Sequence, residues 1–425
     1  MAREQVIADP PVWSWERLSA LAARHGASFY LADVDRFEDN YRRFLRAFRA
    51  IYPKTSVGYS YKTNYLPAFI RRADALGAYS EVVSPFEYDY ARQLGIPGER
   101  ILFNGPVKRT DELAHALASG TVVNADSVSE VGDLIRVAER LGGLFPVGVR
   151  CYLSDHAPGS RFGIDLATAE GKKAIAALDG AADLRLAGLH CHQSGDRSAE
   201  RYRQRTRAMI HLHATALAER PLDFIDIGGG FGGNVSPALA EQLASPPATF
   251  DDYAEAVAGE MHDAYGHDGP RLILEPGMAL LADTMTFVTR VEATKPHRGL
   301  AVVDGSVFNA QPLWNILRGS HNPPITVVPA EHRAPPSAGP WDVVGHSCVE
   351  VDVLHRGHDG PLAIGDYVVV ENVGAYTTVL NAPFIRGTPP IIEMDRAGAT
   401  RRLRPELTAR DLARSHGTVG DARRD

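Results

Sequence analysis

The sequence is poor in lysine, in cysteine and in long apolar runs, and each shortage excludes a class of protein. Only six of the 45 Lys and Arg residues are lysine, and the net charge of -7 lacks the basic excess of nucleic-acid-binding proteins. The three cysteines form no CxxC pair, so neither a zinc knuckle nor a disulfide framework is indicated. No apolar run approaches the roughly 20 residues of a membrane helix, and the N-terminus has no apolar signal core. We therefore expect a cytoplasmic protein that binds neither nucleic acid nor membranes.

Short apolar runs alternate with helix-like segments between residues 56 and 277. The runs that we interpret as strands are 57–62, 79–83, 101–104, 121–125, 146–152, 186–192, 224–228 and 271–275. The helix-like segments include 66–76, 86–94, 110–118, 127–141 and 199–219. Eight strand–helix repeats over roughly 220 residues are typical of a (β/α)8 barrel. A doubly wound open sheet is the alternative, but no GxGxxG motif follows the first strand to favour it.

The composition and the periodicity of the sequence change after about residue 280. Val- and Thr-rich runs separated by Gly, Pro and Asp lie at 284–292, 300–304, 325–328, 342–354, 367–371 and 391–394, and they predict a mostly β domain. The early run Ala27–Leu31 is a candidate to pair with this domain. We therefore predict an α/β protein with a TIM barrel over residues 30–280, a β-sandwich or β-barrel-like domain formed by 1–29 and 281–400, and a charged tail over 401–425.

Four of the predicted barrel strands end in residues with distinctive chemistry. The first ends at Lys62, the sixth at His190 and His192, the seventh at a glycine run that begins with Gly228, and the eighth at Glu275. Active sites of this fold lie at the carboxyl ends of the strands. A charged amine at the end of an apolar strand is costly to bury unless it has a partner. A Schiff base with an aldehyde cofactor removes that cost, whereas the simpler alternative is a lysine that reaches solvent.

The other three groups complement such a cofactor. A glycine run lets backbone N–H groups approach a phosphate, although glycine also serves ordinary tight turns. Histidines two residues apart on a strand either bind a metal or offer a flat ring for stacking. We favour stacking, because no third ligand stands at helix spacing nearby. A carboxylate such as Glu275 against a pyridine nitrogen keeps that nitrogen protonated. Together these groups predict a pyridoxal phosphate site without a metal.

At this level of detail the chain resembles the fold-type III pyridoxal phosphate decarboxylases, the group of diaminopimelate, ornithine and arginine decarboxylases. The resemblance covers about residues 25 to 395. It is carried, in order, by Tyr61-Lys62-Thr63-Asn64, Ser84 with Glu87, Asn124-Ala125-Asp126-Ser127, Arg161-Phe162-Gly163-Ile164, the His192 turn, the Gly228–Gly230 turn, Glu275-Pro276-Gly277, Gly345-His346-Ser347-Cys348 with Asp352, and Gly374-Ala375-Tyr376. It implies an alanine racemase-like barrel with a β domain, and active sites formed at a head-to-tail homodimer interface.

The resemblance also implies roles for single residues. Lys62 resembles the lysine that carries the cofactor, His192 the residue stacked on its ring, and Glu275 the partner of its pyridine nitrogen. The residues expected to bind the cofactor phosphate are Ser194, Gly228, Gly229, Gly230, Gly277 and Tyr376. Cys348 resembles the cysteine that one subunit donates to the other to protonate the carbanion after carbon dioxide leaves. The alternative for Cys348 is an inert buried cysteine.

Several positions depart from the family pattern, and they gather at the substrate end. Met278 replaces the arginine of the family's Glu-Pro-Gly-Arg motif, and Val349 replaces the acid that follows the cysteine in the family. Gln311 and Trp314 occupy the segment where diaminopimelate enzymes place Arg-Pro ahead of Leu-Tyr. Met or Gln cannot replace a bidentate guanidinium. We therefore expect an amino-acid decarboxylase whose substrate is neither diaminopimelate nor ornithine. The alternatives are a diaminopimelate decarboxylase with relocated arginines, and a racemase or non-catalytic homologue, against which Glu275 and Lys62 argue.

Overall fold

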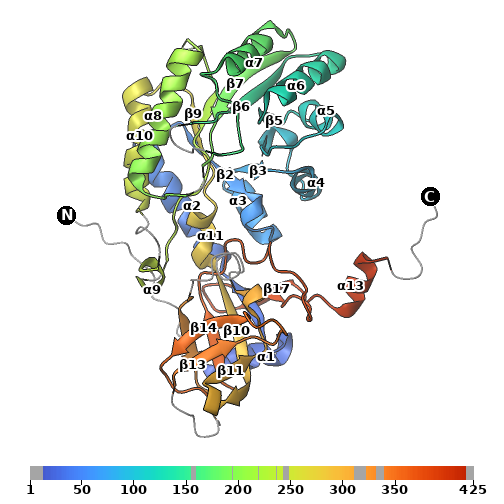
Figure 1. Cartoon of the computed structure of the whole chain (residues 1–425), viewed down its shortest axis with the longest axis vertical. Coiled ribbons are helices and arrows are strands. Elements are labelled where there is room, and N and C mark those ends of the chain that lie inside the picture. The colour runs from blue at the N-terminus through green and yellow to red at the C-terminus, as the bar shows by residue number, and fades with distance from the viewer. Residues whose placement is uncertain are drawn as a thin grey trace. The chain divides into compact units, whose positions relative to one another are not determined.

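The chain forms two compact units, each described here by itself. The computed structural model describes residues 13–154, 159–193, 195–218, 220–235, 237–242, 248–310, 322–331 and 339–417 (Figure 1). The barrel unit comprises Phe37–Gly233 and Leu243–Leu280, and the β unit comprises Met1–Arg36, Asn234–Gln242 and Leu281–Asp425. Among the described residues, no helix is both long enough and apolar enough to cross a bilayer.

Eight strands of the barrel unit pair in chain order and close into a parallel barrel. They are β2 (Thr55–Ser60), β3 (Tyr79–Val82), β4 (Ile101–Phe103), β5 (Val122–Ala125), β6 (Phe145–Arg150), β7 (Leu184–His190), β8 (Phe224–Asp226) and β9 (Arg271–Leu274). The predicted barrel is confirmed, and every predicted strand is present. Seven of the eight strands end one or two residues earlier than predicted. Lys62 lies in a 3-10 turn (Tyr61–Thr63) after β2, and His192 lies two residues beyond the end of β7.

Helices lie outside the barrel strands (Figure 1). They are α2 (Val34–Arg49), α3 (Pro67–Ala75), α4 (Pro85–Gln93), α5 (Thr110–Ala118), α6 (Val128–Leu141), α7 (Ala169–Gly180), α8 (Ala199–Ala216), α10 (Phe250–Tyr265) and the short α11 (Met278–Leu281). Serine side chains begin three of them, because Ser84, Ser127 and Ser198 accept the N–H three residues ahead. The sequence thus specifies where these helices start after each strand.

The β unit holds the second sheet, in the order β14-β13-β11-β10-β1-β16-β17, with β15 pairing β10 and β12. Its strands are β1 (Phe29–Ala32), β10 (Met285–Lys295), β11 (Leu300–Val303), β12 (Ile325–Val328), β13 (Trp341–Val344), β14 (Val353–His358), β15 (Tyr367–Val370), β16 (Ile391–Met394) and β17 (Thr400–Arg404). As expected for the early run, β1 pairs with this sheet, between β10 and β16. Helix α1 (Trp15–His25) covers the sheet through Leu18 and Leu21. Short helices α9 (Pro237–Ala240) and α13 (Ala409–Ser415) complete the unit.

The β unit differs from expectation at two places. The run 342–354 is two strands, because the buried Asp352 carboxylate accepts hydrogen bonds from Ser306 Oγ, Val307 N–H and Ser347 N–H and draws the chain into a turn. A Cβ on Gly345 would lie 2.3 Å from this carboxylate, so the turn needs glycine there. The expected start of the charged tail at 401 falls inside β17, which pairs with β16.

Candidate active site

A polar layer lies directly above the apolar layer inside the barrel. Leu102, Phe224 and Ile273 belong to one buried apolar cluster. The polar residues that follow them by two positions are Asn104, Asp226 and Glu275, all buried. Because side chains alternate along a strand, residues two apart share a face. The three polar groups therefore enter the barrel interior at its carboxyl end.

Lys62 is connected to this layer through a second carboxylate. Its Nζ donates to Ser60 Oγ at 2.8 Å and forms an ion pair with Glu81. The Lys62 side chain is 29 % exposed, whereas that of Glu81 is 1 % exposed. Asn104 Nδ2 donates to Glu81 Oε1 at 3.1 Å and to Glu275 Oε1 at 2.6 Å. The amine thus lies at the open edge of a buried and hydrogen-bonded polar network.

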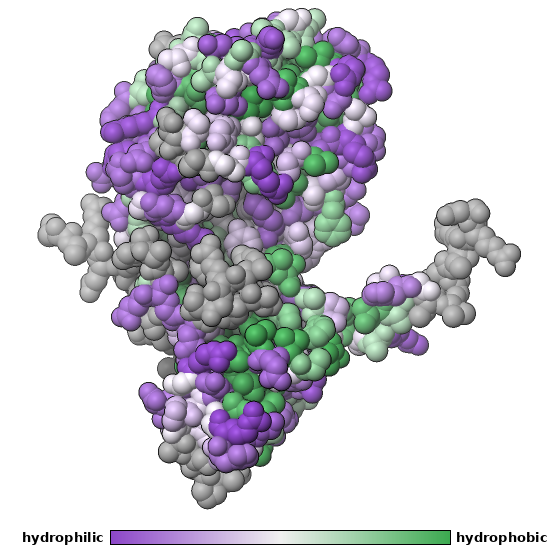
Figure 2. Space-filling view, viewed as in Figure 1, coloured by the Kyte–Doolittle hydropathy of each residue, from purple (hydrophilic) through white to green (hydrophobic). Residues whose placement is uncertain are grey.

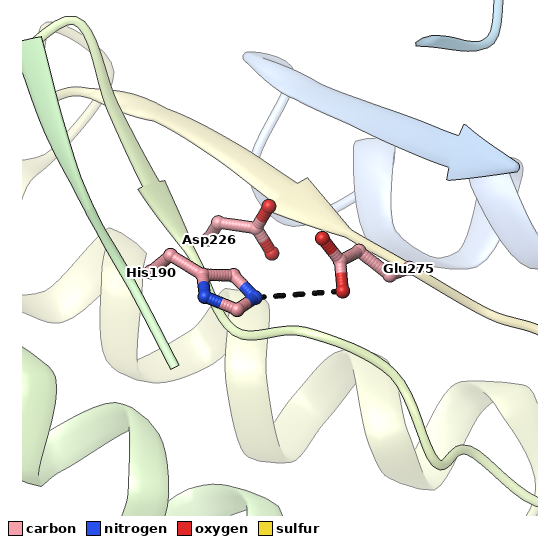
Figure 3. Close-up of side chains that lie close together, drawn as sticks. All are labelled: His190, Asp226 and Glu275. Carbon is pink, nitrogen blue, oxygen red and sulfur yellow. Dashed lines mark ion pairs between the residues drawn. The ribbon is translucent and has the colours of Figure 1, made fainter. Parts of the chain in front are cut away.

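His190, Asp226 and Glu275 point toward one another from β7, from β8 and from the end of β9 (Figure 3). His190 Nε2 lies 3.5 Å from Glu275 Oε2. Burial and the charge of Glu275 raise the pKa of Asp226 well above its ordinary value. Burial alone would raise the pKa of Glu275, but the attraction of His190 and then of Lys62 holds it well below its ordinary range. The two opposite shifts favour a proton on Asp226 and the negative charge on Glu275.

The same trio extends the observation that no third ligand stands at helix spacing near the histidines. The fold brings two carboxylates to His190, with ligand atoms within 4.8 Å of one another. The sequence argument considered spacing along the chain, whereas these ligands come from neighbouring strands. A carboxyl must lose its proton before it binds a metal ion. The raised pKa of Asp226 makes this trio a poorer metal site than its residue types alone indicate.

His192 and the glycine turn are joined by a hydrogen bond. The N–H of Gly229 donates to His192 Nδ1 at 3.0 Å. Burial and the charge of Lys62 hold the pKa of His192 well below its ordinary value, so the ring is neutral. Gly228 and Gly230 have φ values of 71° and 94°, which favour glycine. A Cβ on Gly229 would lie 2.3 Å from Glu275 O, so the turn packs directly on the residue that follows β9.

Two buried residues of α8 donate hydrogen bonds to the carbonyl groups of the glycine turn. The sequence alone does not identify them. Arg205 donates to the carbonyls of Ile227, Gly229 and Gln193 at 3.1 to 3.4 Å. Tyr202 donates to Gly229 O at 3.0 Å. These donors fix the turn's carbonyl groups. A buried arginine within a charged helical segment looks like a surface residue in the sequence, so no local pattern reveals it.

A second buried lysine has a different environment. Lys108 Nζ donates to the carbonyls of Gly105 and Asn124 and pairs with Glu130 Oε1 at 2.9 Å. Its side chain is 0 % exposed, and burial lowers its pKa. Every donor of this amine is directed at the protein itself. Lys108 therefore has a structural environment, whereas the Lys62 side chain is partly exposed.

The remaining predicted residues lie in the β unit, at the start of α11 in the barrel unit, or outside the described residues. Cys348 is exposed, in the turn that Asp352 organises, with Val349 beside it. Tyr376 has a φ of 61°, which is uncommon for a residue other than glycine and is found at functional sites. Met278 opens α11 in the barrel unit. Ser194, Gln311 and Trp314 lie outside the described residues.

The barrel-unit residues fit pyridoxal phosphate. The site offers a half-buried amine, a neutral ring, a buried ionised carboxylate and a glycine turn at one end of the barrel. A Cβ on Gly277 would lie 2.4 Å from Thr63 Oγ1, so the chain after Glu275 also packs closely against the turn that carries Lys62. Preorganised charges of this kind suit an electron-withdrawing cofactor.

Comparisons with known proteins agree with this chemistry. Residues 36–282 match the family model described as "Pyridoxal-dependent decarboxylase, pyridoxal binding domain". A diaminopimelate decarboxylase of Methanothermobacter thermautotrophicus is 29 % identical over 93 % of this chain and 92 % of its own. That of Actinosynnema pretiosum subsp. auranticum is 30 % identical over 93 % and 90 %. The structure of diaminopimelate decarboxylase from M. jannaschii with L-lysine superposes with a TM-score of 0.81 at 23 % identity, over 94 % of both chains.

Proposed function

The chain belongs to the pyridoxal-dependent decarboxylase family, and from this premise we propose that it removes one carboxyl group from meso-diaminopimelate and releases lysine. One observation carries the choice of substrate. Relatives named diaminopimelate decarboxylase match the chain at 29 and 30 % identity over nine tenths of both lengths. The comparisons thus favour the relocated-arginine alternative over the atypical substrate that the sequence departures predicted. They favour neither a racemase nor a non-catalytic homologue.

We assign the amine chemistry to Lys62. Glu81 neutralises its charge, and Ser60 orients its Nζ. This amine would hold the cofactor, and the same Nζ would accept or return a proton during the reaction. Glu81 compensates the positive charge of the Lys62 amine. Its carboxylate stays in place because Asn104 donates a hydrogen bond to its other oxygen.

We assign the electronic role to Glu275. When bound, pyridoxal phosphate withdraws electrons from the bond that breaks as carbon dioxide leaves. An ionised Glu275 strengthens that withdrawal by keeping a ring nitrogen protonated. His190 and Lys62 lower the pKa of Glu275 and so favour its charged form, and Asn104 fixes its orientation. His192 provides a neutral face for the ring, and the turn at Gly228–Gly230 provides N–H groups for the phosphate, together with Ser194, Gly277 and Tyr376.

We further propose that two subunits build each site. The proton donor, Cys348, is exposed on the β unit, as a residue given to a partner must be. Large hydrophobic side chains are also exposed on this unit, namely Val351, Ile364, Leu380, Phe384 and Ile385. Figure 2 shows apolar surface on the β unit. Exposed apolar surface of this kind marks interaction sites, and an isologous dimer uses it twice.

A second substrate class is favoured by particular residues. Met278 and Val349 are uncharged where the family places an arginine and an acid, and Gln311 and Trp314 replace charged recognition with amide and apolar surface. An amino acid with an uncharged or bulky distal group would suit such a pocket. This candidate is the original sequence-based hypothesis, and it makes the opposite prediction for diaminopimelate.

The test is carbon dioxide release from meso-diaminopimelate, ornithine, lysine and a wider set of L- and D-amino acids and their acylated derivatives. We expect kcat/KM for meso-diaminopimelate to be the highest and to reach about 10⁴ M⁻¹s⁻¹ or more. A value roughly a thousandfold below that of another substrate would instead support the uncharged-pocket candidate.

A further inference from the structure

Arg197 contacts the residue that departs from the family motif. It lies between His192 and α8, and its Nη1 is 2.7 Å from Met278 Sδ. The side chain is half-buried. A guanidinium has five N–H donors, and a thioether is a weak acceptor that carries no charge. Among the described residues, no carboxylate lies within ion-pair distance of Arg197. Its guanidinium therefore has no ion-pair partner among the described residues.

The backbone of Arg197 is connected by hydrogen bonds through Tyr253 to the glycine-rich segment that follows β8. The buried Tyr253 hydroxyl donates to Arg197 O at 2.6 Å and accepts from Gly232 N–H at 3.1 Å. A Cβ on Gly233 would lie 2.4 Å from Met278 O, so the glycine turn and the start of α11 pack against each other. Arg197 is thus held beside both the segment after β8 and the segment after β9. A guanidinium fixed beside two such turns, with no ion-pair partner among the described residues, is suited to bind an anionic oxygen group.

Resting on the proposed function, we infer that Arg197 binds an anionic oxygen group in the active site and supplies the guanidinium that position 278 lacks. The group is either the phosphate of the cofactor or the distal carboxylate of the substrate. Both are planar or tetrahedral sets of oxygens that a guanidinium contacts with two N–H groups. Met278 then serves as an apolar wall along which the arginine lies.

The experiment compares the wild type with two variants. Arg197→Gln keeps a polar side chain without the charge. Arg197→Lys keeps the charge but lacks the paired N–H donors of the guanidinium. Arg207→Ala is the matched control, because Arg207 lies on α8 and pairs with Glu260 at the surface. Thermal unfolding confirms that each variant is folded. Apo protein is titrated with pyridoxal phosphate and with pyridoxal, which lacks the phosphate. Holoenzyme is titrated with pimelate and with heptanoate, which lacks the second carboxylate, as competitive ligands.

Two results support the inference, and they distinguish the sources of the anion. If Arg197 binds the phosphate, Arg197→Gln weakens pyridoxal phosphate about ten- to a hundredfold and leaves pyridoxal unchanged. If it binds the distal carboxylate, the cofactor constants are unchanged and the advantage of pimelate over heptanoate falls by a similar factor. Arg197→Lys should lose less in either case, and Arg207→Ala should change nothing.

The inference is overturned if folded Arg197→Gln matches the wild type in both titrations. That result is independent of the substrate, because neither titration requires turnover of diaminopimelate. Should diaminopimelate fail as a substrate while Arg197→Gln still weakens pyridoxal phosphate or pimelate, the proposed function is wrong and the role of Arg197 stands.

Discussion

Two regions of the molecule that carry predicted site residues differ in how they are built. One is the buried polar layer of the barrel unit, called the floor below, which comprises Glu81, Asn104, Asp226 and Glu275. The other is the turn of the β unit that carries Cys348. In the floor, Glu81, Asn104 and Glu275 bond to one another in the buried interior, so their geometry is set before any ligand binds. In the β unit, Cys348 is exposed and Tyr376 has a strained backbone. Under the proposed function, the cofactor would be held by residues buried within one chain, whereas the proposed proton donor Cys348 would act on a surface that a second chain completes.

The largest expected effect separates Lys62 and Lys108, two lysines of the barrel unit. Lys62→Ala should lower kcat at least about a thousandfold, roughly 4 kcal/mol, while the protein stays folded, because the side chain is partly exposed. Lys108→Met should instead destabilise the fold by about 3 to 5 kcal/mol, because it leaves Glu130 buried without its partner. Activity assays and urea unfolding of both variants measure this contrast.

Borohydride treatment of the yellow holoenzyme provides the control. The label should appear on Lys62 and not on Lys108 in a peptide map. A label on another lysine, or a protein that takes up no pyridoxal phosphate, would contradict the assignment of the floor.

The next effect tests whether the β unit serves a second chain. Inactive Lys62→Ala and Cys348→Ala proteins are mixed after subunit exchange has been demonstrated. Because one mixed-dimer site receives both native residues, about a quarter of all sites should recover at random mixing. Recovery is measured as carbon dioxide release. If exchange occurs and activity stays at the level of the separate variants, Cys348 serves its own subunit or has no catalytic part.

A smaller effect is expected from the charge in the floor. Glu275→Gln keeps the shape of the side chain and its contact with Asn104 but removes the negative charge. Turnover should fall at least about tenfold, roughly 1.4 kcal/mol, and cofactor affinity should fall less. Steady-state kinetics and a cofactor titration measure the two quantities. Unchanged turnover would show that Glu275 does not act on the ring nitrogen.

The barrel and the residues at the strand ends could be predicted because both follow from the order of apolar runs and helix-like segments along the chain. Lys62, His192, Gly228 and Glu275 are visible as breaks at the ends of apolar runs. Asp226 lies inside the predicted strand 224–228 without a distinctive local pattern, because its importance arises from Glu275 at the end of the neighbouring strand.

The supporting residues were invisible for similar reasons. Asn104 links two carboxylates that are far apart in the chain, and Arg205 looks like any helix arginine until its carbonyl partners are known. The substrate hypothesis rested on missing arginines, and a motif comparison does not detect an arginine such as Arg197 that reaches position 278 from another loop.

The smallest effect concerns the proton that the floor holds. The pKa of Asp226 is raised in the folded chain, whereas an unfolded aspartate titrates near 3.9. Above about pH 4 the folded state therefore binds a proton that the unfolded chain has lost, and stability falls as pH rises toward the folded pKa, by at most about 1.4 kcal/mol per pH unit. Glu275 has the opposite shift, so its contribution is complete above about pH 4 and does not change in this window.

Asp226→Asn isolates this proton. The amide oxygen can accept from Gly228 N–H as the carboxyl oxygen does, and the amide nitrogen carries donors but no charge beside Glu275. We expect the variant to retain most activity and to have a shallower fall in stability between about pH 5 and pH 8 than the wild type. Urea unfolding of both apo proteins across that range measures the difference. Equal slopes would mean that Asp226 is ionised in the folded chain, and the charge balance of the floor would then have to include two carboxylates facing His190.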